Sequence, residues 1–399
     1  MTADGEQTRA LRPPAAQRFA QRPLALPVHR STTYAFDTAQ QYADVLAGDD
    51  AGYCYARIDN PTADAFAAGV AAMEGLAVPY DVVGQPFASG MAAISTTLMA
   101  LTSAGGHVVA ARELYGGTYG LLANQLSRFG VTTTFVDVSD IEAVRSAMTA
   151  ATAVVWAETI ANPTLSVADL PRLAEVAHSV GALLVVDSTF ASPAVCRPLD
   201  HGADLVVHSA TKYLGGHSDV TGGVVCGRRE LVEAVRAVRI DLGGSLAPDE
   251  AYLLARGLQT LPLRVERHCA SALALARALD GDPALERIDY PGLDAHRDHA
   301  LAARLLLHGR YGGVVTVTPA GGREAGLAFC DALRLVQVAT SLGGTHSLVS
   351  PVASTTHRQL SDEALRAAGI GPAACRISVG LEDPEDLVAD VRQALASLP

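Results

Sequence analysis

One side chain in this 399-residue sequence is unlike all the other basic residues. Of the 30 lysines and arginines, 29 are arginine and one is Lys212. Arginine stays protonated, whereas a lysine can be tuned to a neutral amine that forms a Schiff base with a carbonyl group. We therefore predict that Lys212 is catalytic. The alternative, a chance survivor on an exposed surface, fits poorly with its place between an apolar segment and a run of Ser, Thr and Gly.

A second candidate for chemistry is Asp187, which ends the apolar segment 183–187. It precedes Lys212 by 25 residues, about the length of one β-α-β crossover plus a loop. A carboxylate at the end of an apolar strand needs a cationic partner. A protonated pyridine nitrogen would be such a partner, and the carboxylate would keep that ring an effective electron sink. Taken alone, an aspartate after a strand can equally be a helix cap.

Three loops supply residues suited to binding a phosphorylated aromatic cofactor. Gly90 and Met91 begin a predicted helix, whose first amides present free N–H groups and a positive dipole end to a phosphate. Ser209 and Thr211 could add hydroxyl groups, and Tyr115 could stack on a cofactor ring. Each feature alone is also explained by an ordinary turn or a packing tyrosine. Together with the lysine and the aspartate, they predict a pyridoxal 5'-phosphate site.

From about residue 61, short Val-rich segments alternate with helical stretches. This alternation predicts an α/β fold with a mostly parallel central sheet flanked by helices. Ligands of such sheets bind beyond the carboxyl ends of the strands. The predicted strands are 82–83, 107–110, 131–136, 153–157, 182–187, 204–208 and 223–226, and the predicted helices are 91–101, 118–129, 141–148 and 170–180.

The sequence predicts three units along the chain. Residues 1–60 lack a sustained period and are expected to form an extended arm that is ordered by docking. Residues 61–255 are expected to form the large cofactor-binding domain, and residues 256–399 a smaller C-terminal α/β domain. Around the boundary we expect a long helix broken by Pro262. Its predicted bounds are 248–280, and the later elements are strands 314–318 and 335–340 and a final helix 384–398.

Composition excludes several classes of function. A formal net charge of −12 argues against a nucleic-acid or anionic-membrane partner, because both require a basic surface. No apolar run approaches the roughly 20 residues that span a bilayer, and no signal-peptide pattern is present, so we expect a cytoplasmic protein. The six cysteines are scattered and are expected to be buried free thiols. We predict no metal site.

The order of these motifs resembles the Cys/Met-metabolism pyridoxal-phosphate enzymes, a fold-type I group. It contains cystathionine γ-synthase, cystathionine γ-lyase, methionine γ-lyase and O-acetylhomoserine sulfhydrylase. The most specific match is His-Ser-Ala-Thr-Lys-Tyr at 208–213, followed by Gly-Gly-His. The similarity runs from about Pro27 to the C-terminus, with further matching segments at 55–62, 89–91, 161–163, 340–344, 354–357 and 376–380.

The resemblance implies roles that the residues alone do not. Tyr55 and Arg57 match a pair that reaches from a neighbouring subunit to the cofactor phosphate. This implies a homo-oligomer, typically a tetramer of two active dimers. Arg376 matches the arginine that binds the substrate α-carboxylate, assisted by Asn162 and Ser341. A guanidinium, which can form a bidentate pair with a carboxylate, suits that task.

The resemblance also implies the reaction. It suggests a carbon–sulfur lyase that removes the γ-substituent of a sulfur amino acid of the methionine, homocysteine or cystathionine type, giving a 2-oxo acid, ammonia and a thiol. Lys212 would move protons on the substrate, and Tyr115 would assist the leaving group. The alternative is γ-replacement, as in O-acetylhomoserine sulfhydrylase or cystathionine γ-synthase. A non-catalytic scaffold is disfavoured because it would have lost its one lysine first.

Two positions and one segment point to different branches of the group, so they leave the substrate undecided. Methionine γ-lyases usually have cysteine where this chain has Gly117, and cystathionine-using members usually have glutamate where it has His346. Segment 354–361 is most similar to sulfhydrylases and methionine γ-lyases. Because His346 lacks a carboxylate, we expect cystathionine to be a poorer substrate than methionine, unless this side chain only faces solvent.

Overall fold

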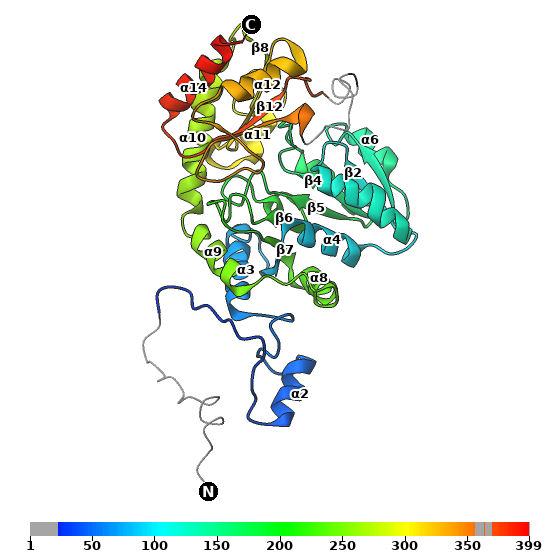
Figure 1. Cartoon of the computed structure of the whole chain (residues 1–399). Coiled ribbons are helices and arrows are strands. Elements are labelled where there is room, and N and C mark those ends of the chain that lie inside the picture. The colour runs from blue at the N-terminus through cyan, green and yellow to red at the C-terminus, as the bar shows by residue number, and fades with distance from the viewer. Residues whose placement is uncertain (1–22, 356–362, 364–368, 399) are drawn as a thin grey trace.

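The computed structural model describes residues 23–355, 363 and 369–398 (Figure 1). Two β-sheets organise the body of the molecule, and the N-terminal arm projects from the end opposite the smaller sheet (Figure 1). The chain is an α/β protein with a mostly parallel central sheet, as the sequence predicts.

The central sheet has seven strands in the order β1-β7-β6-β5-β4-β2-β3, and β7 alone runs antiparallel to both of its neighbours. Along β4, Val154 and Trp156 belong to one hydrophobic core while Val155 and Ala157 belong to the other. Burial on both faces explains why the strands are near-continuous apolar runs. The strands are β1 Val82–Phe87, β2 His107–Ala111, β3 Thr132–Val136, β4 Thr152–Glu158, β5 Leu183–Asp187, β6 Leu205–Ser209 and β7 Gly223–Arg228.

Helices cover both faces of this sheet and form a separate core on each. On one face lie α3 Pro61–Glu74, α6 Ile141–Ala147, α7 Leu170–Ser179, α9 Pro248–Leu258 and the first part of α10 Leu261–Leu279. On the other lie α4 Gly90–Leu101, α8 Arg229–Leu242 and the segment 116–129. A short 3₁₀ turn, η3 Pro198–His201, precedes β6.

A second sheet of five strands, in the order β10-β11-β12-β9-β8, packs with α12, α14 and the end of α10 around a third core. β12 pairs antiparallel with β9 and β11, so Arg376 lies in the middle of this sheet, opposite Thr316 and Ser350. The elements are β8 Leu285–Asp289, α11 His299–Leu305, η4 Leu307–Gly309, β9 Val314–Pro319, α12 Gly322–Ala332, β10 Gln337–Val338, β11 Leu348–Pro351, η5 Val352–Ser354, β12 Cys375–Ser378 and α14 Pro384–Ala396.

The described part of the arm, residues 23–60, contains one helix, α2 Ala39–Ala47, which has no buried residue and lies away from the body (Figure 1). The arm is fixed only near its root. There Arg239, itself buried, donates to the backbone carbonyls of Arg57 and Ile58, and Arg30 pairs with Asp249 at 2.7 Å. This fits a segment whose order depends on docking, because it buries too little apolar surface to fold alone.

Two predicted elements differ in the structure. The helix expected over 118–129 is divided into α5 Gly116–Gly120, a π-helical turn η1 Leu121–Gln125 and a 3₁₀ turn η2 Leu126–Phe129. Glycines within its first turns restrain the backbone weakly, which lets the hydrogen-bond register change. The strand expected over 335–340 shortens to the two residues of β10, an exposed edge paired only with β11. The break expected near Pro262 is confirmed between α9 and α10.

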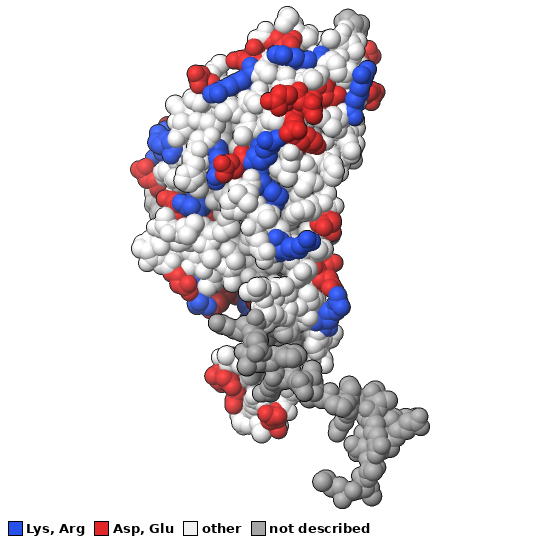
Figure 2. All heavy atoms as spheres, turned by 90° about the vertical axis from the view of Figure 1, so that its left-hand side faces the viewer, with Lys and Arg blue, Asp and Glu red and all other residues white. Residues whose placement is uncertain are grey.

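The surface carries interspersed acidic and basic side chains on the face shown in Figure 2. Within the described ranges, no helix combines the length and apolar character needed to cross a bilayer. All six cysteines are free, and five of them are buried, whereas Cys54 is only partly covered. The prediction of buried free thiols is therefore confirmed for five positions.

Candidate functional site

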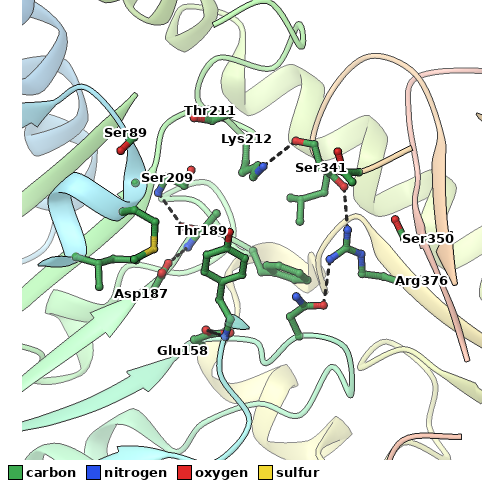
Figure 3. Close-up of a pocket in the computed structure, with 18 of the residues that line it drawn as sticks. Ser89, Glu158, Asp187, Thr189, Ser209, Thr211, Lys212, Ser341, Ser350 and Arg376 are labelled. Atoms are coloured by element: carbon green, nitrogen blue, oxygen red, sulfur yellow. Dashed lines mark hydrogen bonds between the residues drawn. The ribbon is translucent and has the colours of Figure 1, made fainter. Parts of the chain in front are cut away.

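A cavity of about 430 Å³ lies beyond the carboxyl ends of β4, β5 and β6, between the two sheets (Figure 3). This is where a doubly wound sheet is expected to bind its ligand, and the volume is that of an ordinary small-molecule site. Ten of the residues predicted from the sequence line it: Gly90, Met91, Tyr115, Asn162, Asp187, Ser209, Thr211, Lys212, Ser341 and Arg376.

Lys212 enters the cavity from the loop after β6 (Figure 3). Its Nζ donates a 2.8 Å hydrogen bond to Oγ of Ser341. Burial, and next the nearby Arg376 guanidinium, lower the pKa of the Lys212 ammonium, because both penalise its charged form. Ser341 has a φ of 83°, a strained backbone conformation for a residue other than glycine, and such strain is often found at functional sites.

Asp187 lies at the end of β5 with 7% of its surface exposed. Its Oδ1 accepts from the backbone N–H of Thr189 at 3.0 Å, and no ion pair found among the described residues includes it. Burial raises the pKa of the Asp187 carboxyl, while the bonds from Thr189 act in the opposite direction. A buried carboxylate with free acceptor capacity at the floor of a cavity suits a cationic ring nitrogen.

The start of α4 forms a cup at the opposite end of the cavity from Arg376 (Figure 3). The Ser89 side chain caps α4 by accepting from Ala92 N–H at 3.1 Å. A Cβ added at Gly90 would lie 2.6 Å from the Cβ of Ser209, so only glycine allows α4 and the end of β6 to approach this closely. The free N–H groups of the first turn and the hydroxyls of Ser209 and Thr211 together suit an anion.

Tyr115 lies at the start of α5, with its ring at the mouth of the cavity and 47% of its surface exposed. Its backbone N–H donates to Oε1 of Glu158 at 2.6 Å. A Cβ added at Gly117 would meet the Tyr115 ring at 2.5 Å and the Met91 sulfur at 2.9 Å. The tyrosine ring therefore occupies space that any larger residue at position 117 would need.

Arg376 lines the cavity from β12 with 7% of its surface exposed. One terminal nitrogen donates to Oδ1 of Asn162 at 3.1 Å and the other to the carbonyl of Ser341 at 2.9 Å. Its Nε is buried without a hydrogen-bond partner among the described residues, and burial lowers the pKa of the guanidinium to about 10. A buried cation bound only to neutral acceptors, with a free donor, is suited to a carboxylate ligand.

Three predicted site residues lie outside this cavity. Tyr55 and Arg57 line a separate hollow in the arm, and Arg57 donates to the carbonyl of Ile240 at 2.5 Å. His346 is exposed and lines an outer cavity that shares Thr211 and Ser341 with the inner one. The predicted motif 354–357 runs beyond the described residues after Thr355.

The sequence reasoning missed several lining residues, of which Glu158 is the most notable. It ends β4 beside Asp187 in the sheet register, with 7% of its surface exposed. Burial, and next the neighbouring Asp187, raise the pKa of its carboxyl well above the usual range. Its position at a strand end is the signal that identified Asp187, so the same reasoning would have found it. Phe190, Thr189 and Ser350 also line the cavity, without a comparable sequence signal.

Comparison with known proteins gives this geometry a context. The family model of the Cys/Met metabolism PLP-dependent enzymes matches residues 7–396. The chain belongs to this family. It is 42% identical to the L-methionine γ-lyase of Fusobacterium nucleatum subsp. nucleatum (94% of each chain) and 41% identical to the O-succinylhomoserine sulfhydrylase of Pseudomonas aeruginosa (92% of this chain, 90% of the relative).

A solved structure agrees with the fold. A Campylobacter jejuni protein assigned as an O-acetylhomoserine (thiol)-lyase matches with a TM-score of 0.90 and 31% identity, over 96% of this chain and 97% of its own. That structure carries N'-pyridoxyl-lysine-5'-monophosphate. The present chain is therefore a fold-type I pyridoxal-phosphate-dependent enzyme, and the cofactor predicted from the sequence is confirmed.

The cavity of this chain fits pyridoxal phosphate by its own chemistry. It contains one amine, at Lys212, a buried carboxyl group with free acceptor capacity, at Asp187, and the anion cup that begins at Gly90. The aromatic ring of Tyr115 lies at the same cavity. The amine suits the aldehyde of the cofactor, and the carboxyl group suits its pyridine nitrogen. The anion cup suits its phosphate, and the tyrosine ring suits the face of its ring.

Proposed function

We propose that this enzyme removes the γ-substituent of a sulfur amino acid by breaking its Cγ–S bond, as a carbon–sulfur lyase of the methionine γ-lyase type. The observation that carries the proposal is that the Lys212 amine and the Arg376 guanidinium meet at one residue, Ser341, through its hydroxyl and its carbonyl. An α-carboxylate on Arg376 would hold the Cα of an amino acid within reach of Lys212.

In this proposal, bound pyridoxal phosphate supplies an electron sink for negative charge at Cα. Lys212 removes the Cα proton and moves protons between neighbouring carbons, which a neutral amine can do and a guanidinium cannot. Arg376, Asn162 and Ser341 orient the substrate. Tyr115 donates a proton to the leaving sulfur, and water then releases a 2-oxo acid and ammonia.

The remaining cofactor contacts follow the same logic. Asp187 would pair with the pyridine nitrogen, and the helix start at Gly90 and Met91, with Ser209 and Thr211, would bind the phosphate. Tyr55 and Arg57 would complete that phosphate site from a neighbouring subunit, in a tetramer of two active dimers. Their distance from the cavity of their own chain supports this.

We also infer a division of labour along the chain. Residues 1–60 would form the shared arm, 61–255 the cofactor-binding domain and 256–399 the smaller domain that carries Arg376. The protein would act in the cytoplasm on a small-molecule substrate, without a nucleic-acid or membrane partner. The net charge of −12 supports the last point.

A second candidate function is γ-replacement, in which a thiol or sulfide enters where the γ-substituent leaves. The similarity to an O-succinylhomoserine sulfhydrylase supports γ-replacement as the alternative. Incubating the holoenzyme with methionine, with cystathionine, and with O-acetylhomoserine plus sulfide separates the two. A 2-oxo acid, ammonia and methanethiol from methionine support elimination. Homocysteine formed from O-acetylhomoserine, with no turnover of methionine or cystathionine, would replace our proposal by the second one.

A further inference from the structure

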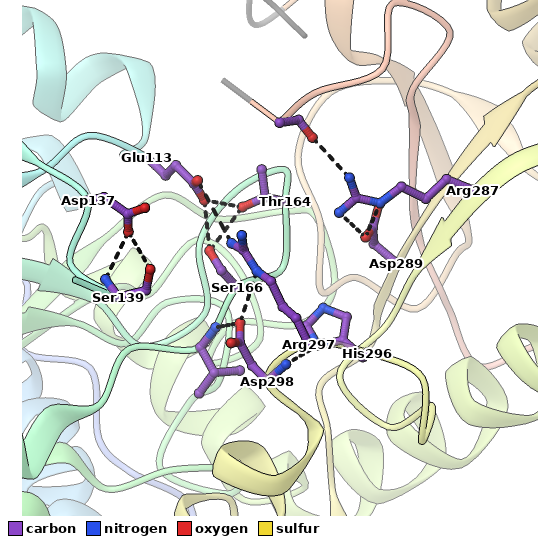
Figure 4. Close-up of polar contacts among 12 residues, drawn as sticks. Glu113, Asp137, Ser139, Thr164, Ser166, Arg287, Asp289, His296, Arg297 and Asp298 are labelled. Atoms are coloured by element: carbon purple, nitrogen blue, oxygen red, sulfur yellow. Dashed lines mark hydrogen bonds and ion pairs between the residues drawn. The ribbon is translucent and has the colours of Figure 1, made fainter. Parts of the chain in front are cut away.

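A polar cluster outside the cavity joins two of the loops that form it (Figure 4). Oε2 of Glu113 accepts hydrogen bonds from the hydroxyls of Thr164 and Ser166, the latter at 2.7 Å. The two hydroxyls lie 3.1 Å apart. Because a carboxylate only accepts, and charge-assisted bonds are stronger than neutral ones, Glu113 is well suited to hold two hydroxyl donors at once.

Glu113 lies in the short loop between β2 and α5, two residues before Tyr115. Thr164 and Ser166 lie in the loop after β4, which also contains the cavity-lining residue Asn162. The Glu113 cluster, by which we mean Glu113, Thr164 and Ser166, therefore joins the loop that carries Tyr115 to the loop that carries Asn162. None of its three members lines the cavity.

The second loop needs external support to keep its shape. Leu165, between the two hydroxyl residues, is buried and has a φ of 56°, which is unfavourable for a branched side chain. Thr164 is only 5% exposed, so its hydroxyl would be costly to leave without a partner. Glu113 supplies that partner and stabilises the turn in this conformation.

Neighbouring residues hold the cluster from the other side. Asp298, just before α11, accepts from the backbone N–H of Val167 at 3.0 Å and lies 3.5 Å from the Arg297 guanidinium (Figure 4). Arg297 in turn lies 4.0 Å from Oε1 of Glu113. Both oxygens of the Glu113 carboxylate are thus engaged, one by the Asn162 loop and one by a cation from a later part of the chain.

We propose that Glu113 is a positioning residue, which holds Tyr115 and Asn162 in register across the cavity without touching the substrate. The proposal deepens the function proposed above and rests on it. Inside the cavity, the Glu158 carboxyl group accepts from the Tyr115 backbone, so the Tyr115 loop is held by one acidic side chain on the inside and another on the outside. Because Arg376 donates to Asn162 at 3.1 Å, the position of Asn162 also determines the position of the Arg376 guanidinium.

The test compares Glu113→Ala and Glu113→Gln holoenzymes with Glu175→Ala, an exposed glutamate on α7, as the matched control. Glu113→Ala should lower kcat/KM by about tenfold to a hundredfold, a range within what misplaced catalytic groups can cost. KM should rise as well as kcat fall, because both Asn162 and Tyr115 lose support. Glu113→Gln should lose less, since its amide oxygen still accepts from the two hydroxyls. Loss of folded enzyme alone would lower kcat and leave KM unchanged.

A double-mutant cycle shows whether the bonds themselves are responsible. The Thr164→Val, Ser166→Ala double variant should reproduce the loss, and adding Glu113→Ala to it should cause little further change, because residues of one network are not additive. Independent, additive losses would overturn the proposal. So would wild-type kinetics in Glu113→Ala. If Glu113→Ala does not fold, Glu113→Gln and the double variant carry the same comparison.

The circular dichroism of the bound cofactor's absorption band gives a readout that does not depend on the substrate. A shifted Tyr115 ring should change this band in Glu113→Ala but not in Glu175→Ala. If wild-type enzyme cleaves none of the sulfur amino acids, the proposed function fails, and the band still decides whether Glu113 positions Tyr115. An unchanged band would count against Glu113 even if the proposed function held.

Discussion

At the scale of single residues, the site depends on one amine placed among groups that favour its neutral form. Lys212 has Ser341 as its hydrogen-bond partner and pairs with no carboxylate among the described residues, and both burial and Arg376 lower its pKa. This environment explains why arginine could not replace it, because a guanidinium would stay charged.

Lys212 should carry the cofactor covalently, since it is the only lysine side chain in the sequence. Treating the holoenzyme with borohydride should fix the cofactor to this residue, and intact-mass and peptide analysis should locate the added mass there. Lys212→Ala should still bind the cofactor but lose turnover by several orders of magnitude. An intact mass without the increment after reduction would refute the assignment.

Gly117→Ala should disturb Tyr115 specifically. The added methyl group would lie 2.5 Å from the tyrosine ring, so the ring must move, and kcat/KM should fall by about tenfold. Gly120→Ala, three residues further along the same segment, is the control because nothing lies within 4 Å of its added Cβ. Equal activity of the two variants would mean that the position of the Tyr115 ring does not affect catalysis.

His346 carries the prediction on specificity. It lines the outer cavity, where a substrate's distal end would emerge, and it offers an imidazole instead of a carboxylate that could pair with a distal ammonium. Methionine should therefore be preferred over cystathionine by about 1–3 kcal/mol, roughly tenfold to a hundredfold in kcat/KM. His346→Glu should narrow the gap. Equal kcat/KM values that the substitution leaves unchanged would show that this exposed side chain selects nothing.

At the scale of elements, α10 links the two sheets through His268, which is fully buried. Its Nδ1 lies 2.7 Å from the carbonyl of Val379, just after β12, and its Nε2 has no partner among the described residues. Burial lowers the pKa of the imidazole to about 4, so the folded protein holds this residue neutral. The contact joins α10 to the strand that carries Arg376.

This histidine predicts a loss of stability in mild acid. The unfolded chain binds a proton at His268 near its ordinary pKa of 6.5, whereas the folded chain resists protonation until about 4. The free energy of unfolding should therefore fall as the pH is lowered from 6.5 to 4, by at most about 3 kcal/mol from this group. Urea unfolding of wild type and His268→Asn at pH 7, 5 and 4 measures the difference. Parallel pH dependences would exclude His268 as a source.

At the scale of the whole molecule, the arm is the feature that a single chain leaves unexplained. Its helix α2 buries no residue, and Tyr55 and Arg57 lie away from the cavity of their own chain. A second subunit would explain both observations, because the arm could pack on its surface and Tyr55 and Arg57 could contribute to its phosphate site.

Shared sites can be tested by mixing two differently impaired subunits. Arg57→Ala should weaken cofactor phosphate binding by about 1.5–3 kcal/mol, the range for a hydrogen bond to a charged group. When Arg57→Ala and Lys212→Ala subunits are combined, some hybrid sites contain both intact residues, and activity should return. Mixed oligomers that form and stay inactive would contradict the shared site.

The sequence alone was sufficient for the parts of this protein that depend on local pattern. The Val-rich segments specified the central strands, because only burial on both faces requires such runs, and the strand ends and following loops identified Asp187, Gly90 and Lys212. Arg376 was found only through a family resemblance. Nothing local distinguishes a buried arginine in the middle of β12 from a charge on an exposed strand.

Tertiary structure decided what depends on distant segments meeting. Glu113 and Ser166 are 53 residues apart, and Lys212 and Ser341 are 129 apart, so no local period connects either pair. The helix expected over 118–129 changed its hydrogen-bond register, and the edge strand β10 shortened. In each case the outcome depends on which neighbours a segment packs against, and that information lies in the folded chain as a whole.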